Sequence, residues 1–513
     1  MGFLDSAPFS DDPVRLDVAD VFAPAVGGDG DVARLRLLVN GSWRPASEEA
    51  EFDVASPIDG TVIARAQRAN AEDVNEAIAS ARDARAAFGA MPATERVRIC
   101  GRAAQIMSEH LDDFIHAIVL DLGKTPEQAG SEASATNERL ELVRDEARKI
   151  YGEYLPGEWV GDTSGKMGIV LREPVGTVGA IGPFNYPLFL SASKIIPAIA
   201  AGNTVVAKAP SADPVPLLMF ARMLEEAGLP PGVLNVITGS GAQIGDLLSS
   251  HEDVSMLTFT GSSAVGRRIA EKAGPKPLHL ELGGNAAAIV LADADPELAV
   301  SKTVDGAFKN AGQRCDAISR VLVEDGFYDE YVERALEEAR GFVVGDPREE
   351  DVDVGPLVDA GAAKRVNGFV EDAVSKGARL QLGGEFTDAY HQPTVLVDVP
   401  LGAEILWEEH FGPVLPVTRV RDLQEALEVS NQSRYGLDSS VFTDNLDRAW
   451  SAAEALEVGM VTINDAPKHG VGHFPFGGRK PDSGIGREGL GYSIDECTQI
   501  KTVVQPLRGK LAG

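Results

Sequence analysis

The sequence between residues 256 and 273 reads Met-Leu-Thr-Phe-Thr-Gly-Ser-Ser-Ala-Val-Gly-Arg-Arg-Ile-Ala-Glu-Lys-Ala. Residues 256–260 predict a buried strand, and residues 264–273 have the spacing of an amphipathic helix. The turn between them carries Gly261, Ser262 and Gly266. Because free N–H groups at such a turn can approach a pyrophosphate, we predict part of a dinucleotide site here. A plain helix cap by Ser262 or by Ser263 would give the same pattern.

The same alternation of strands and helices extends in both directions from this stretch. Strand-like runs lie at 175–181, 204–207, 233–238 and 286–291, and helical runs at 216–227 and 264–273. A second alternating region has helices at 296–310, 328–339 and 362–375, and strands near 321–324 and 461–464. Residues 72–145 are mainly helical, with Val74, Ile78, Ala81, Ala84 and Phe88 on one face. Strand–helix alternation is typical of parallel sheets covered by helices, so we predict two α/β domains.

Composition excludes several classes of protein. The 513 residues carry 78 acidic and 47 basic side chains, a formal net charge of −31. This charge argues against nucleic acid or an anionic membrane as a partner. It fits a halophilic, salt-rich cytoplasm, where salt screens self-repulsion, although an ordinary acidic cytosolic protein is the alternative. Three cysteines, no long apolar run and no signal peptide predict a cytoplasmic location.

Two other glycine patterns are weaker phosphate-loop candidates. The run Gly239-Ser-Gly-Ala-Gln-Ile-Gly245 follows a strand but is one residue longer than the usual fingerprint. The triplet Gly123-Lys124-Thr125 resembles the end of a P-loop, but Ile118 stands where the upstream glycine belongs. We therefore assign neither pattern to a nucleotide.

Cys315 is the candidate nucleophile. It follows Gly312, Gln313 and Arg314, just beyond a predicted helix. A lone cysteine is more often a buried apolar residue, but the glycine and polar neighbours favour reactivity here. We expect Arg314 to stabilise the thiolate. Cys100 and Cys497 are expected to pack in the core.

Five motifs occur in order along the chain: Pro183-Phe-Asn-Tyr-Pro187, Phe259-Thr-Gly-Ser262, Leu280-Glu-Leu-Gly-Gly284, Gly312-Gln-Arg-Cys315 and Glu409-His-Phe-Gly-Pro413. Together they resemble the aldehyde dehydrogenase superfamily, from about residue 38 to the C-terminus. The resemblance implies the fold of that family, with two parallel-sheet α/β domains and a β-arm for oligomerisation.

The resemblance also implies three catalytic residues. Cys315 would attack the aldehyde as a thiolate. The Asn185 amide and the Cys315 backbone N–H would stabilise the oxyanion. Glu281, in an apolar strand where a surface charge would be out of place, would be the general base that hydrolyses the thioester. Its presence favours a free acid as the product over transfer to coenzyme A. No metal site is predicted.

For the cofactor, the resemblance implies NADP or NAD. Lys208 matches a lysine that reaches the adenosine ribose, and Glu409 and Phe411 match residues at the nicotinamide ribose and ring. Ser211 occupies a position where the family often has a glutamate that repels a 2′-phosphate. We therefore expect NADP to be accepted.

Longer strings narrow the resemblance. Residues 312–318, 463–470, 473–480 and 486–492 look most like archaeal non-phosphorylating glyceraldehyde-3-phosphate dehydrogenases. This implies substrate contacts from Arg314, Tyr186, Lys468 and Arg139. Lys468 stands where arginine is more frequent and loses bidentate geometry. An exposed helix charge is the alternative for Arg139.

Three other interpretations stay open. The substrate could be an aldehyde without phosphate, such as lactaldehyde or succinic semialdehyde. The chain could also be a catalytically silent structural protein on this fold, or a thiol hydrolase, although no histidine has a convincing spacing from Cys315.

We divide the chain into four parts. Residues 1–35, with a turn-rich stretch at 27–30, form an acidic extension. Residues 36–157 and 177–281 form the dinucleotide-binding domain, and 282–487 the catalytic domain. Residues 158–176 and 488–513 form the oligomerisation arm. A small aldehyde is the expected ligand, and the arm predicts a homodimer or homotetramer.

Overall fold

A computed structural model of the chain describes residues 3–28, 32–469 and 474–507. Parts of several predicted segments lie outside the described residues. These are the start of the acidic extension, residues 29–30 of its turn, Gly470 and His473 of the longer strings, and the last six residues of the arm. Within the described part of the chain, none of the helices is long and apolar enough to cross a membrane.

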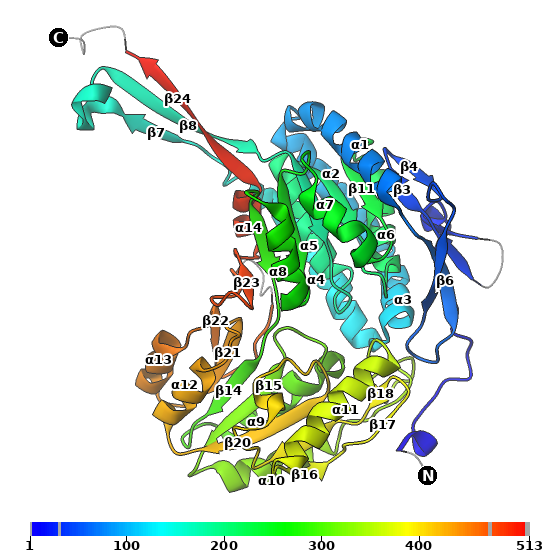
Figure 1. The fold of residues 1–513 in the computed structure, drawn as a ribbon, viewed down its shortest axis with the longest axis vertical. Coiled ribbons are helices and arrows are strands. Elements are labelled where there is room, and N and C mark those ends of the chain that lie inside the picture. Colours follow the sequence, from blue (N-terminus) through cyan, green and yellow to red (C-terminus); the bar gives the residue numbers. More distant parts are fainter. Residues whose placement is uncertain (1–2, 29–31, 470–473, 508–513) are drawn as a thin grey trace.

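The first large sheet has eight strands in the order β23-β13-β12-β9-β10-β11-β3-β4 (Figure 1). Its five central strands are parallel: β9 (Thr177–Ile181), β10 (Thr204–Lys208), β11 (Leu234–Ile237), β12 (Met256–Thr260) and β13 (Leu278–Glu281). All residues of β9 to β12 are buried, as expected for strands covered on both faces. Antiparallel edge strands are β3 (Leu37–Val39), β4 (Ser42–Arg44) and β23 (Gly484–Ile485).

The second large sheet has seven strands in the order β16-β19-β20-β15-β14-β21-β22. Six are parallel: β14 (Ala286–Val290), β15 (Ile318–Glu324), β19 (Thr394–Val397), β20 (Val414–Val420), β21 (Asp438–Phe442) and β22 (Met460–Ile463). The edge strand β16 (Arg379–Leu382) is antiparallel, and β17 (Phe386–Thr387) pairs with β18 (Tyr390–His391). The predicted class, two parallel-sheet α/β domains, is confirmed.

Helices cover both sheets (Figure 1). Around the first lie α1 (Ala71–Gly89), α2 (Ala93–Glu109), α3 (Leu111–Leu122), α4 (Pro126–Ala147), α5 (Phe189–Ala201), α6 (Val215–Glu226), α7 (Asp246–Ser250), α8 (Ser263–Ala273) and α14 (Leu490–Glu496). Around the second lie α9 (Pro296–Phe308), α10 (Tyr328–Ala339), α11 (Ala360–Ser375), α12 (Leu423–Asn431) and α13 (Leu446–Ala455). On α1 the predicted apolar face is buried at four of its five positions, and Ala84 is half-buried.

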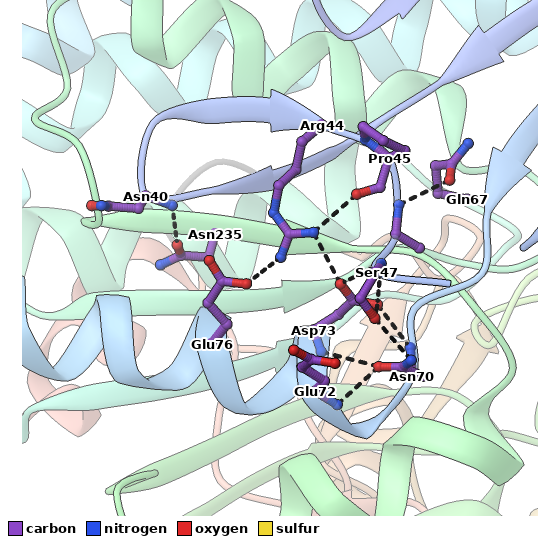
Figure 2. Close-up of polar contacts among 11 residues, drawn as sticks. Asn40, Arg44, Pro45, Ser47, Gln67, Asn70, Glu72, Asp73, Glu76 and Asn235 are labelled. Atoms are coloured by element: carbon purple, nitrogen blue, oxygen red, sulfur yellow. Dashed lines mark hydrogen bonds and ion pairs between the residues drawn. The ribbon is translucent and has the colours of Figure 1, made fainter. Parts of the chain in front are cut away.

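The start of α1 is fixed by a polar network (Figure 2). The Asn70 side chain accepts hydrogen bonds from the N–H groups of Glu72 and Asp73, and the Asp73 carboxylate accepts one from the Asn70 N–H. Arg44, at the end of β4, reaches Asp73 at 3.0 Å and Glu76 at 2.5 Å. This capping box and its arginine attach the edge of the first sheet to α1.

The arm is a three-stranded antiparallel sheet that projects from the body of the molecule (Figure 1). It contains β7 (Glu153–Pro156), β8 (Lys166–Pro174) and β24 (Thr498–Pro506). The arm therefore begins at β7, earlier than the predicted residue 158. All four residues of β7 are exposed, so no alternation of apolar and polar residues marks it as a strand.

The N-terminal residues that were predicted to form an acidic extension contact the rest of the molecule. Strands β1 (Val26–Gly27) and β2 (Ala33–Leu35) join β5 (Glu51–Ala55) and β6 (Val62–Gln67) in a four-stranded sheet. Ahead of them, the Phe9 ring lies 5.4 Å from that of Tyr390, and the Phe22 ring lies 5.6 Å from that of Phe114. This segment thus contacts both α/β domains.

Candidate active site

Two cavities lie on either side of Cys315. One of about 490 Å³ is lined by Asn185, Ser262, Leu282, Glu409 and Phe411, among others. The other, of about 360 Å³, is lined by Glu132, Tyr186, Arg314, Lys468 and His469, among others. Cys315 lines both. We call them the α8-side cavity and the α4-side cavity, after the helices that border them.

The loop before Cys315 has an unusual backbone. Asn310, Ala311 and Gly312 all have positive φ angles, of 55°, 52° and 72°. A Cβ atom on Gly312 would lie 2.1 Å from the Gly412 carbonyl oxygen, and one on Gly284 would lie 2.0 Å from the Cys315 carbonyl oxygen. Only glycine fits at such approaches, so Gly312 and Gly284, from two separate motifs, allow the close packing around the cysteine loop.

The expectation that Arg314 favours the thiolate is not met. The Arg314 guanidinium is buried and paired with Asp316, with Nε 3.0 Å from Oδ1. Desolvation raises the pKa of the Cys315 thiol well above its ordinary value of 9.0, and the charges of Asp316 and Glu281 raise it further. The thiol is therefore protonated at neutral pH in this state.

Asn185 lies in the loop between β9 and α5. Its side-chain amide donates a hydrogen bond to the Gln313 carbonyl at 3.0 Å, so it faces the cysteine loop. The Asn310 side chain donates to the Asn185 carbonyl at 3.3 Å from the other direction. These contacts bring the predicted amide and the predicted nucleophile together, although 130 positions separate them in the sequence.

Glu281 ends β13 and is buried. Among the described residues, neither carboxylate oxygen has a hydrogen-bond partner. Burial and the nearby Glu488 raise the pKa of Glu281 well above its ordinary value, against the opposing charges of Lys194 and Arg487. A Cβ atom on Gly477 would lie 2.8 Å from Oε1 of Glu281. A buried carboxyl with a raised pKa is the environment that suits a general base.

The glycine turn of α8 opens onto the α8-side cavity, which Gly261 and Ser262 line. Ser262 also caps the helix, because its hydroxyl accepts from the Val265 N–H at 3.4 Å. A Cβ atom on Gly266 would lie 2.4 Å from Leu282, so the glycine lets α8 pack closely there. The capping role and a phosphate-facing turn are therefore compatible.

Glu409 and Phe411 line the same cavity. The Glu409 carboxylate accepts a hydrogen bond from the Gly284 N–H at 3.0 Å. Desolvation raises the pKa of Glu409 to about 7. The Phe411 ring lies edge-on to that of Phe184, 5.8 Å away. The α8-side cavity thus combines a carboxylate and an aromatic ring with the N-terminus of a helix.

Lys208 is buried at the end of β10, and Ser211, three residues further on, is exposed. The Lys208 ammonium donates to the Ala209 carbonyl at 2.9 Å and lies 3.4 Å from the Ser211 hydroxyl. Burial lowers the pKa of Lys208 to about 8. In the described part of the chain, these two residues lie outside the walls of both cavities.

The predicted substrate residues separate into two groups. Tyr186, Arg314 and Lys468 line the α4-side cavity. Arg139 does not, within the described residues: it is 2% exposed, and its guanidinium carbon lies 4.5 Å above the Phe189 ring. The alternative that Arg139 is an exposed helix charge is therefore wrong, because Phe189 covers it.

The α4-side cavity is also lined by residues that were not predicted as site residues, among them Lys309, Asp316 and His469. The His469 backbone N–H donates to Asp316 at 2.7 Å, and its ring nitrogen lies 2.7 Å from Glu488. Each of these residues lies in or next to a motif already described. Their proximity to those motifs in the sequence was the signal that could have identified them.

The chain belongs to the aldehyde dehydrogenase family, whose sequence model matches residues 43–503. It is 38% identical over 473 residues to a 3-sulfolactaldehyde dehydrogenase of Priestia aryabhattai, covering 92% of this chain and 98% of that protein. It is 40% identical over 467 residues to an NADP-dependent glyceraldehyde-3-phosphate dehydrogenase of Streptococcus equinus, covering 91% and 97%.

A crystal structure of a related enzyme agrees with the fold. The NADP-dependent glyceraldehyde-3-phosphate dehydrogenase of Bacillus halodurans, solved with NADP, superimposes with a TM-score of 0.89 at 39% identity. The match covers 92% of this chain and 99% of that one. The family is thus supported by motifs, by relatives over nearly their full length and by three-dimensional similarity.

Proposed function

We propose that the protein oxidises a short anionic aldehyde to its carboxylic acid, with NADP or NAD as the oxidant, and that glyceraldehyde 3-phosphate is the substrate. The product would be 3-phosphoglycerate, formed without inorganic phosphate. One observation carries the proposal: Cys315 lies where a cavity suited to a dinucleotide meets a second cavity lined by Arg314, Lys309 and Lys468.

The residues of the α8-side cavity fit a dinucleotide. The N-terminus of α8 at Ser262 would face the pyrophosphate, and Glu409 and Phe411 would hold the nicotinamide ribose and ring. Leu282, seated against Gly266, closes the wall. A bound nicotinamide would supply the hydride acceptor for the reaction.

The chain's own residues account for the remaining steps. The Cys315 sulfur adds to the aldehyde carbon, and the new oxyanion accepts hydrogen bonds from the Asn185 amide and the Cys315 N–H. After oxidation of that carbon, Cys315 carries the acyl group as a thioester. Glu281 then takes a proton from water as the water attacks the thioester, which releases the acid and the thiol.

Because the pKa of the Cys315 thiol is high, formation of the thiolate requires an additional stabilising charge. A positive charge brought near the sulfur would lower the pKa of the thiol, and an oxidised nicotinamide ring carries such a charge. In its absence, alkylation of Cys315 should become faster as the pH rises beyond 9, because the thiolate is the reactive form.

An anionic substrate fits the α4-side cavity. Arg314 has Asp316 on one side and donates to the Pro467 carbonyl at 3.1 Å, so its remaining donor groups are held in place by the protein. Lys309 and Lys468 add positive charge, although Asp305 and Glu138 line the same space. The relatives from Priestia aryabhattai and Streptococcus equinus are named for aldehydes that end in a sulfonate and a phosphate, respectively. A 3-sulfolactaldehyde is accordingly the second candidate substrate.

A substrate panel tests this proposal. Activity should be measured with glyceraldehyde 3-phosphate, glyceraldehyde, 3-sulfolactaldehyde, lactaldehyde and succinic semialdehyde. We expect the Arg314→Ala variant to lose about 10- to 100-fold in kcat/KM on the phosphorylated aldehyde, the value of one or two charge-assisted hydrogen bonds. Loss of kcat/KM on glyceraldehyde should be much smaller. An equal loss on both substrates would contradict the phosphate contact.

The cofactor preference has its own test. Ser211 leaves no carboxylate to repel a 2′-phosphate, so NADP should be accepted. The Ser211→Glu variant should lower kcat/KM for NADP at least about tenfold, by charge repulsion, and change the value for NAD much less. A wild-type kcat/KM for NADP far below that for NAD would refute the expectation.

A further inference from the structure

The triplet Gly123-Lys124-Thr125 has no role in the site described so far. Its lysine is 1% exposed, deep between α3 and α4. The Lys124 ammonium lies 2.6 Å from the Glu132 carboxylate, and both side chains are almost fully buried. Burying an ion pair costs desolvation free energy that its Coulomb attraction seldom exceeds, so such a pair is weak evidence of a role in stability alone.

Each partner also contacts the loop that carries Asn185. The second oxygen of Glu132 accepts hydrogen bonds from the N–H groups of Leu188 and Phe189, both at 3.0 Å. These are the first free N–H groups of α5, and Leu188 has no side-chain oxygen with which to cap them. Glu132 is therefore a cap supplied by a different helix, with its charge at the positive end of α5.

Lys124 contacts the same loop at Tyr186. Its ammonium lies 3.4 Å from the centre of the Tyr186 ring. A cation over an aromatic face is attracted to it, and more strongly when both are removed from water. Tyr186 is the residue next to Asn185, and the Tyr186 carbonyl accepts from the Leu190 N–H at 3.0 Å. The pair thus fixes residues 186 and 188–189, immediately after the amide.

We propose that the buried Lys124–Glu132 pair is a positioning device that holds the Asn185 amide in place for the oxyanion and the Tyr186 ring in place for the substrate. The inference rests on the proposed function, because the amide matters only if a tetrahedral intermediate forms at Cys315. Lys124 and Glu132 act through Asn185 and Tyr186 rather than on the reacting atoms.

The key variant is the double substitution Lys124→Met with Glu132→Gln. It removes both buried charges together, so neither charge is left without a partner, and it retains an acceptor for the α5 N–H groups. We expect kcat per folded enzyme to fall about tenfold or more, since loss of an oxyanion donor costs about 10²–10³ and displacement costs less. KM for NADP should stay within about twofold, because the α8 turn is untouched.

Two further variants sharpen the test. Lys124→Arg keeps the cation and should restore most of the kcat. Glu141→Gln removes an exposed carboxylate from the same helix, α4, and should leave kcat unchanged. A double variant with normal kcat would overturn the proposal, as would a rise in KM for NADP in parallel with the loss of kcat. A role in stability alone would lower Tm and leave kcat per folded enzyme intact.

Different results would contradict the proposed function. It fails if the wild-type enzyme oxidises none of the panel aldehydes, or if Cys315→Ser is as active as wild type. The positioning role fails if the wild type is active and the double variant matches it.

Discussion

Glu409 is a side chain whose burial in the candidate site lowers the stability of the folded protein. The carboxyl is held at the Gly284 N–H, and desolvation raises its pKa to about 7 from an ordinary value of 4.5. Between these two values the native state binds a proton that the unfolded chain has released. Stability should therefore fall as the pH rises through this window, and the loss should be complete above pH 7.

The Glu409→Gln variant should reverse this loss. Glutamine keeps the acceptor for the Gly284 N–H and has no charge to bury. We expect the variant to be more stable than wild type by on the order of 2 kcal/mol at pH 8, and nearly equal to it below pH 4.5. Thermal unfolding at several pH values measures the difference. Glu408→Gln, next to it but paired with Arg434 at the surface, is the control and should change the stability by less than about 1 kcal/mol.

At the scale of residues, the motifs predicted which side chains would lie near one another. Asn185, Cys315, Ser262 and Glu409 line one cavity, and the motifs had already placed them together. Arg139 and the ionisation of Cys315 were not predictable. Burial of Arg139 depends on Phe189 from another helix, and the Arg314 charge is shared with Asp316. Both effects come from tertiary neighbours that a local pattern does not contain.

At the scale of elements, the packing of α8 determines the shape of the α8-side cavity. A Cβ atom on Gly266 would meet Leu282 at 2.4 Å, and Leu282 lines the α8-side cavity. A larger residue at position 266 must therefore push Leu282 into the space proposed for the cofactor. The sequence pattern predicted this helix almost to the residue, since its apolar stripe is regular and its turn is rich in glycine.

We expect Gly266→Ala to raise the dissociation constant for NADP at least about fivefold, because overpacking at a tight contact costs about 1–3 kcal/mol. Isothermal titration gives the constant. Gly101→Ala is the matched control: Gly101 is also in a helix, α2, and an added Cβ would meet nothing within 4 Å. That change should stabilise the protein by about 0.5–1 kcal/mol and leave the dissociation constant for NADP unchanged. Equal affinity in the two variants would contradict the argument.

Elements with periodic burial were predictable, and exposed ones were not. Helix α10 occupies the predicted residues 328–339, because Tyr328, Tyr331, Ala335 and Ala339 form a regular buried stripe. Strand β7 was missed because both of its faces are exposed, so it has no periodicity. It forms a strand because it pairs with β8, and the local sequence does not indicate this pairing.

For the whole molecule, the arm presents an unusual exposed surface. Tyr154, Ile169, Leu171 and Val503 are exposed apolar residues, and the strand register places them on one face of the three-stranded sheet. An apolar face on a projecting sheet with open edges is typical of a surface that another chain covers. The predicted homodimer or homotetramer would cover it.

The Ile169→Lys and Val503→Lys double variant should therefore dissociate into smaller species, seen by sedimentation velocity. These two residues are cross-strand neighbours, so both charges fall at one point of the face. Thr502→Lys, one position along on the opposite face, should leave the mass unchanged. An unchanged mass in the double variant would show that this face is not the interface.

Strand β23 has a consequence for recombining this chain with its relatives. It comes from the segment that follows the second sheet, yet Gly484 pairs with Glu281 and Ile485 with Leu280 in the first. A chimaera with one crossover between the two sheets would therefore join Glu281, the proposed general base, from one parent to a neighbouring strand from the other. Exchange of the whole first sheet needs a second crossover after Ile485, so that Glu281 keeps its own neighbouring strand.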